Sequence, residues 1–132
     1  MIMYSTYTEK EKEASIVALT FIMNACGSQN RTKKQEAYLR DLIEQKSNFG
    51  LSPYEVQNAM VMSLDDCYSI IRNMSQSKKE FLLDMLAKML SLEGRYNDDK
   101  IKAYTEICVL TNMPMMLAGD LMEKHILLNS EI

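Results

Sequence analysis

Hydrophobic residues recur at helical spacing along most of the chain. The clearest case is the stretch from Ser77 to Asp99, where apolar residues three and four positions apart form one broad stripe with charged residues outside it. The stripe consists of Phe81, Leu82, Met85, Leu86, Met89, Leu90 and Leu92. Ser77 and Glu80 have the spacing of a capping box and Gly94 suits a C-cap, so the pattern predicts a helix between them. Such a wide stripe must be buried, and we expect the rest of the chain to pack around it.

Capping patterns divide the remaining sequence into further helices. Capping boxes, in which two side chains satisfy free backbone N–H groups at a helix start, are predicted at Thr8 with Glu11, Thr32 with Gln35, and Ser52 with Glu55. Ser63, the pair Asp98 and Asp99, and Pro114 predict three more helix starts. The inward face of the first helix is predicted to be Ala14, Val17, Ala18, Phe21, Ile22 and Ala25.

No segment alternates between apolar and polar residues as a strand does. We therefore predict an all-α fold, a compact bundle of about seven helices with two pseudo-repeated helical hairpins. At 132 residues the chain is expected to be a single all-helical domain, residues 1–132, with residues 1–7 as an N-terminal arm that either frays or packs.

Composition and charge narrow the classes of function. The chain is 47% hydrophobic and 25% charged, which is ordinary for a globular protein. No apolar run approaches the roughly 20 residues that cross a bilayer, and the N-terminal residues have no secretory pattern, so we expect a cytoplasmic protein without a transmembrane segment. A net charge of −3 lacks the basic surface that drives nucleic-acid binding, and we expect no nucleic-acid partner.

Residues that commonly carry catalysis are sparse. The sequence has no GxSxG, HExxH, P-loop or GxGxxG motif, and His125 is its one histidine. Cys26, Cys67 and Cys108 lie far apart among apolar residues, as buried thiols do, and lack the pairing of a zinc site. We expect a protein that is not an enzyme and has no cofactor other than a divalent metal ion. A carboxylate-based hydrolase, which would need paired acids in a pocket, is the enzymatic alternative.

The two halves of the chain repeat one layout. In each half an apolar helix reaches a glycine (Gly27 or Gly94), a polar loop leads into a second helix, and a proline (Pro53 or Pro114) opens the next helix. This layout resembles the TerB-like family, named for a tellurite-resistance protein, through MLAKMLSLEGRYNDDKIKAYTEICVLTNMP and the weaker match FIMNACGSQNRTKKQEAYLRDLI. The resemblance covers about residues 15–128. It implies a helical bundle, a bacterial cytoplasmic or membrane-peripheral role in stress response, and an acidic patch that binds metal ions.

The acidic patch implied by the resemblance has four candidate ligands in this sequence. They are Glu93, Asp98, Asp99 and Glu36. Two departures weaken such a site: Cys26 replaces one expected carboxylate, and Lys100 stands near the position of another. Hard cations depend on the number and charge of their oxygen ligands. The alternative is that Asp98 and Asp99 only cap a helix and complement its dipole.

Methionine is unusually frequent, with twelve residues in the chain. Four of them near the C-terminus are candidates for a partner-binding surface: Met113, Met115, Met116 and Met122. Methionine adapts to irregular apolar partners, but the same residues at helical spacing also fill cores, and Met60 and Met62 admit the same two interpretations. We therefore predict a non-enzymatic interaction or sensing module that binds a protein partner or self-associates through an apolar Met-rich surface. The alternative is a divalent-metal-ion-binding regulator that uses the acidic residues.

Overall fold

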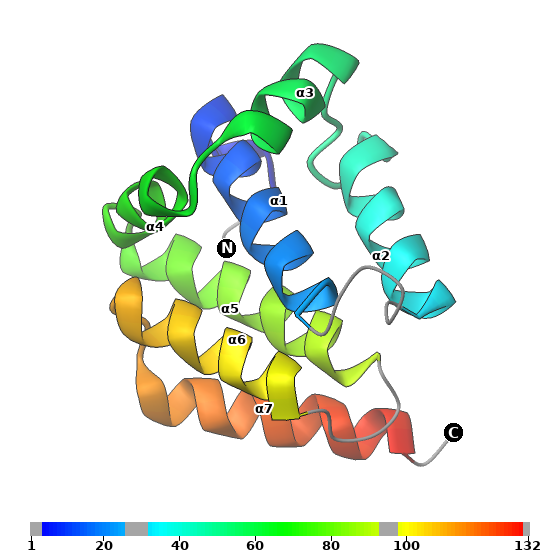
Figure 1. The fold of residues 1–132 in the computed structure, drawn as a ribbon, viewed down its shortest axis with the longest axis vertical. Coiled ribbons are helices and arrows are strands. Elements are labelled where there is room, and N and C mark those ends of the chain that lie inside the picture. Colours follow the sequence, from blue (N-terminus) through cyan, green and yellow to red (C-terminus); the bar gives the residue numbers. More distant parts are fainter. Residues whose placement is uncertain (1–3, 26–31, 93–97, 131–132) are drawn as a thin grey trace.

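The computed structural model describes residues 4–25, 32–92 and 98–130. Its elements are the 3-10 helix η1 (Tyr4–Thr6) and the α-helices α1 (Glu9–Met23), α2 (Lys33–Glu44), α3 (Pro53–Val61), α4 (Leu64–Arg72), α5 (Gln76–Ser91), α6 (Asp98–Leu110) and α7 (Met115–Ser130) (Figure 1). These residues contain seven α-helices and no strand, which confirms the predicted all-α bundle. No helix in this part of the chain is both long enough and apolar enough to cross a membrane.

Most helices start at the predicted residues, where the N-cap side chain forms a local hydrogen bond. The capping boxes of Thr8, Thr32 and Ser52 are all present, with each side chain accepting a backbone N–H three residues later. The side chain of Ser63 likewise accepts the N–H of Asp66 at the start of α4. The structure confirms these predictions. Sequence can predict an N-cap because the cap depends only on residues within one turn.

The predicted start of α5 is wrong, and its predicted C-cap lies outside the described residues. The N-cap is Ser75, whose Oγ accepts the backbone N–H of Lys78, so Ser77 lies inside the helix and forms no capping box with Glu80. A serine can cap without an acidic partner, and two serines two residues apart offer competing starts. The last helical residue is Ser91, whereas Gly94, the predicted C-cap, lies outside the described residues.

Two helices form the centre of the fold. Helix α5 packs against α1, α6 and α7, and its fully buried side chains include Leu82, Leu83, Leu86 and Met89. Helix α1 contacts α2, α3, α4, α5 and α6 (Figure 1). The expectation that the chain is organised around the apolar stripe of residues 81–92 therefore holds, with α1 as a second central element.

The face that α1 turns to the core differs from the prediction. Ala14, Ala18 and Ile22 are fully buried as expected, and Leu19, which was not predicted, is buried with them. Three other predicted core residues, Val17, Phe21 and Ala25, are only partly buried. Helix α1 is apolar on both sides, so periodicity alone does not decide which side the neighbouring helices cover. An apolar stripe of a central helix is thus left partly open to solvent.

Residues 4–7 of the predicted N-terminal arm pack against the core. The Tyr4 ring makes edge contacts with Phe49 and Phe81, with ring centroids 5.1 Å and 4.8 Å apart. Tyr7 is buried, and its hydroxyl donates a hydrogen bond to the carbonyl of Lys78. Of the two alternatives for this arm, packing describes residues 4–7.

Candidate functional site

The described acidic candidates lie on the first turns of two helices. Asp98 and Asp99 are exposed at the start of α6, and Glu36 is partly buried at the start of α2. Glu93 lies outside the described residues. Among the residues that the structure describes, no group of three or more His, Cys, Asp or Glu side chains could hold a metal ion. The four-residue metal site stays a prediction, and its three described members do not form one by themselves.

A buried ammonium group lies where these two first turns meet. Lys100 is fully buried, and its Nζ donates to Oε1 of Gln35 at 2.9 Å. The same Oε1 accepts the backbone N–H of Thr32 at 3.1 Å, and Nε2 of Gln35 donates to the carbonyl of Met89 at 3.0 Å. Gln35, also fully buried, therefore joins α2, α5 and α6 at one point. A positive charge next in sequence to Asp99 opposes a divalent cation there by direct repulsion.

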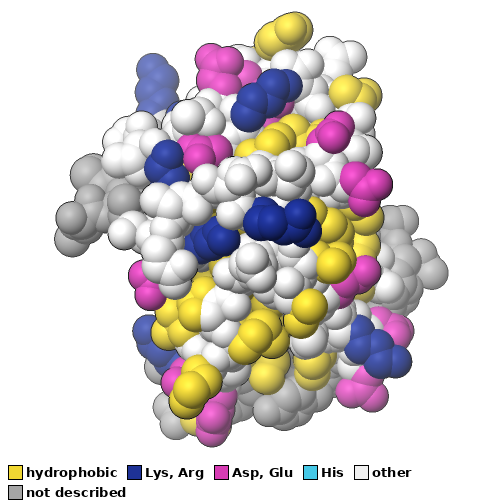
Figure 2. Space-filling model, turned by 90° about the vertical axis from the view of Figure 1, so that its left-hand side faces the viewer, with side chains coloured by type: hydrophobic (Ala, Val, Ile, Leu, Met, Phe, Trp, Pro, Cys, Tyr) yellow, Lys and Arg dark blue, Asp and Glu magenta, His cyan; other side chains and the backbone are white. Residues whose placement is uncertain are grey.

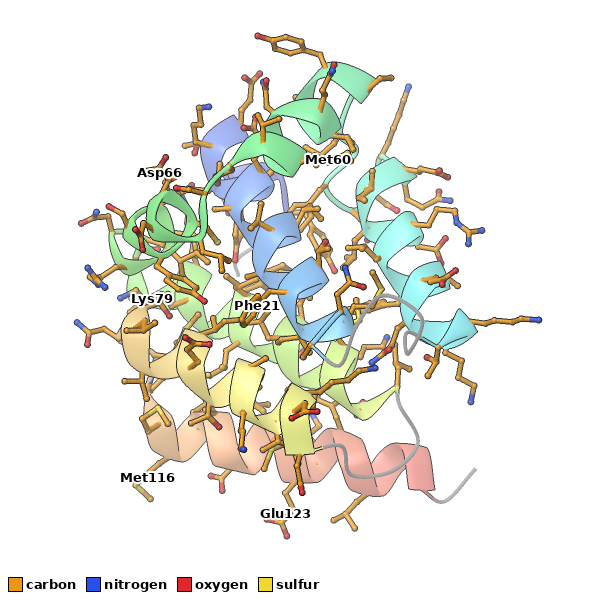
Figure 3. All side chains as sticks on the ribbon, viewed as in Figure 1. Phe21, Met60, Asp66, Lys79, Met116 and Glu123 are labelled. Carbon is orange, nitrogen blue, oxygen red and sulfur yellow. The ribbon has the colours of Figure 1, made fainter. Side chains whose placement is uncertain are left out.

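The four methionines predicted to bind a partner do not share one surface. Met113 is 4% exposed and belongs to the core, so its assignment to a partner-binding surface is wrong and core filling describes it. Met122 is partly buried. Met115 and Met116 are exposed at the start of α7, and Figure 3 shows Met116 at the edge of the fold. The turn before them holds Asn112 at φ 58°, a left-handed conformation that asparagine tolerates.

Met115 and Met116 belong instead to a small apolar corner at the turn from α6 to α7. Its exposed members are Val109, Leu110, Met115 and Met116. Figure 2 views the side of the molecule that carries this turn and shows hydrophobic side chains on its lower half with charged side chains around them. Exposed apolar residues in small numbers are common on protein surfaces.

A larger apolar feature lies over the open stripe of α1. One hollow of about 810 Å³ is bounded by α1, α3 and α6, and a second of about 760 Å³ lies between α2 and α3. The two share the lining residues Met23, Leu39, Ile43, Val56 and Met60, so they adjoin each other and are treated as one apolar feature. We call it the α1 groove. Figure 3 shows Phe21 on α1 and Met60 on α3, two of the residues that line it.

The floor and walls of the α1 groove are mostly apolar. Val17 and Phe21 form part of the floor, and three methionines, Met23, Met60 and Met62, line the walls. Met60 is 81% exposed, whereas the neighbouring Val56 is partly buried. The spacing of Met60 and Met62 admits both a core and a surface interpretation, and it gives no link to α1 because the groove joins residues from separate helices.

Charged side chains border the α1 groove on two helices in the same order. On each of α2 and α6, a basic residue lies between two acidic residues that are three or four positions away. The six residues are Glu36, Arg40 and Glu44 on α2, and Asp99, Lys102 and Glu106 on α6. Among the described residues of this border, four carboxylates face two basic groups, a surplus of two negative charges.

The described cysteines and histidine have packing roles. Burial raises the pKa of the Cys67 and Cys108 thiols to about 12, so neither is a thiolate nucleophile at neutral pH. The Nε2 atom of His125 lies 2.8 Å from Oδ1 of Asp84 and links α7 to α5. Neither group lines the α1 groove.

Comparisons with family models, with curated proteins and with solved structures find no match to this chain. The resemblance to the TerB-like family stays a prediction from sequence motifs, and function depends on the site more than on the fold.

Proposed function

We propose that this protein is a non-enzymatic protein-interaction module and that the α1 groove is its binding surface. The observation that carries the proposal is the open apolar stripe of α1, a helix that contacts five others yet leaves Val17 and Phe21 partly exposed in a depression. Concave apolar surfaces bordered by polar residues are typical of interaction sites.

The chemistry of the groove favours a protein partner over a small substrate. Its described charged groups lie along the borders on α2 and α6, and its uncharged polar side chains, Thr20, Asn24 and Gln57, are distributed over α1, the turn after it and α3. Burying apolar surface contributes about 25 cal/mol per Å², so covering the floor of this groove is a strong drive for association. The flexible side chains of Met60 and Met62 can repack around a partner, which suits recognition of varied apolar surfaces.

The ion-binding alternative has less support. It depends on the TerB-like resemblance and on Glu93, and the buried Lys100 ammonium stands beside its other ligands. A cytoplasmic stress-response role follows from the resemblance alone and is kept as the proposed setting of the module.

The proposal is tested by selecting binders from a displayed random-peptide library on the full chain. Affinities of selected peptides are then compared for wild-type protein and three variants, Met60→Glu, Val61→Glu and Met116→Glu. All three residues are at least 80% exposed, so the substitutions are expected to leave folding intact. Met60 lines the α1 groove, its neighbour Val61 does not, and Met116 belongs to the corner at the start of α7.

We expect Met60→Glu to weaken peptide binding at least tenfold and the other two variants to bind as the wild type does. Binding that is unchanged in Met60→Glu would refute the groove as the binding surface. A loss confined to Met116→Glu would move the site to the α6–α7 corner, and a library that yields no binder would also count against the proposal.

A further inference from the structure

We propose that the partner segment in the α1 groove is an amphipathic helix whose apolar stripe is flanked by lysine and arginine. This inference rests on the proposed function, since it requires the groove to be the binding surface. The shape of the groove, the elements that border it and the sign of its border charges each contribute to it.

The length of the floor matches a short helix. The lining residues of α1 and the turn after it run from Ile16 to Ala25, which corresponds to about 14 Å at a rise of 1.5 Å per residue. An amphipathic helix of two to three turns, roughly 10 residues, spans this distance and presents apolar side chains at positions i, i+3 or i+4, and i+7. Those anchors would lie over Val17 and Phe21 and against Met60.

The bordering elements favour a helix over an extended segment. The described lining residues belong to helices or to the turns that join them, and this part of the chain has no strand edge with free backbone groups. An extended peptide on an apolar floor would leave its own backbone N–H and C=O groups without partners, which is costly. A helix satisfies these groups internally and brings only side chains to the groove.

The charges on the groove borders indicate which side chains should flank the apolar stripe of the partner helix. Arg40 lies one turn from both Glu36 and Glu44 on α2, and the spacing on α6 places Lys102 between Asp99 and Glu106 in the same way. Each basic residue is thus offset by acids on its own helix, and the surplus on each border is one negative charge. Lysine or arginine on both sides of the partner's stripe would meet these surplus carboxylates while their aliphatic stems cover the edges of the floor.

The same charges disfavour a second copy of this chain as the occupant. The chain has a net charge of −3, and a symmetric dimer through the groove would bring its acidic borders together. Like charges across an interface oppose association, so self-association is an outcome for the test to detect and not the expected result.

The test uses three synthetic peptides of 16 residues with the same number of leucines. The first has leucines at helical spacing with lysines flanking the stripe, the second has glutamates in place of the lysines, and the third has the composition of the first in an order that removes the stripe. Dissociation constants are measured on the full chain by fluorescence anisotropy in low and high salt, helix formation is followed by circular dichroism, and sedimentation reports dimers.

We expect the lysine-flanked peptide to bind as a helix, at least tenfold more tightly than the other two, and more weakly as salt rises. The double variant Glu44→Gln with Glu106→Gln should weaken this binding severalfold, because both carboxylates are exposed at the groove border. A matched control, Glu80→Gln with Glu123→Gln, removes the same charge from exposed positions outside the groove and should have no effect.

Other results overturn the inference in ways that separate it from the proposed function. Three results would refute the basic helix: tighter binding of the glutamate-flanked peptide, binding without helix formation, or equal loss of affinity in both double variants. The groove would still be the binding surface if Met60→Glu abolished the binding that was observed. A dimer that Met60→Glu disrupts would make a second copy the occupant. If no peptide bound and library selection gave no Met60-dependent binder, the proposed function itself would fail.

Discussion

Replacement of Gln35 by leucine removes the side chain that joins three helices at the buried ammonium of Lys100. The Nζ of Lys100 loses an acceptor at 2.9 Å, the carbonyl of Met89 loses a donor at 3.0 Å, and the backbone N–H of Thr32 loses an acceptor at 3.1 Å. A hydrogen bond to a charged group is worth about 1.5–3 kcal/mol, and a capping contact about 0.5–1 kcal/mol. We expect Gln35→Leu to lower the free energy of unfolding by about 3 kcal/mol, which corresponds to a fall in Tm of about 10 °C for a chain of this length.

Urea unfolding of four proteins measures the coupling directly. They are the wild type, Gln35→Leu, Lys100→Met and the double variant. Because methionine brings no charge that needs an acceptor, Lys100→Met should cost at least about 1 kcal/mol less in the Gln35→Leu background than in the wild type. Lys102→Met, an exposed residue on the same helix, is the control and should change stability by no more than about 0.5 kcal/mol.

Additive effects of the two substitutions would refute this account of the contact. The same conclusion would follow if Gln35→Leu cost no more than Lys102→Met. Either result would mean that Gln35 does not hold the Lys100 ammonium in place, and repulsion by Lys100 would then no longer count against a metal ion at this position.

Four further predictions concern the thiols, an ion pair and metal ions. In a Cys26→Ser background, Cys67 and Cys108 should resist a thiol reagent until the protein unfolds, and fast labelling of the native state would contradict their burial. Because burial raises both thiol pKa values from 9.0 to about 12, the unfolded chain loses these protons first, so urea titrations should show stability falling as pH rises from about 9 to 12. Asp84→Asn, which removes the charge that His125 contacts, should cost less than about 1 kcal/mol because the carboxylate is half exposed, and a larger loss in urea would show that the pair matters more than its exposure implies. Calcium, magnesium, manganese or zinc added to metal-free protein should leave Tm unchanged, and a rise with any of them would favour the ion-binding alternative.

The helix boundaries show how far sequence reasoning reaches in this protein. The starts at Thr8, Thr32 and Ser52 follow from side-chain and backbone hydrogen bonds three residues apart, and the structure confirms them. The predicted start of α5 at Ser77 is wrong, and the N-cap is Ser75. Both serines satisfy the local rule, and packing of the whole helix decides between them.

The candidate site was less accessible from sequence than the fold. The methionine pattern led to Met113, which the structure places in the core, while Met60 lines the α1 groove. Both residues have the same chemistry and both lie near a helix end, so nothing local distinguishes them. The difference arises from which neighbouring helices cover each one.

The sequence by itself determined the all-α class, most of the helix starts and the buried stripe of α5, because capping and periodicity act within a few residues. Only the tertiary structure decided that Val17 and Phe21 face a groove, since α1 is apolar on both sides and its neighbours choose the covered one. Tertiary structure also decided that Lys100 would find its acceptor on Gln35, 65 residues earlier in the chain. Contacts between residues so far apart in sequence depend on how the helices pack against one another, and the local spacing of residues does not determine that packing.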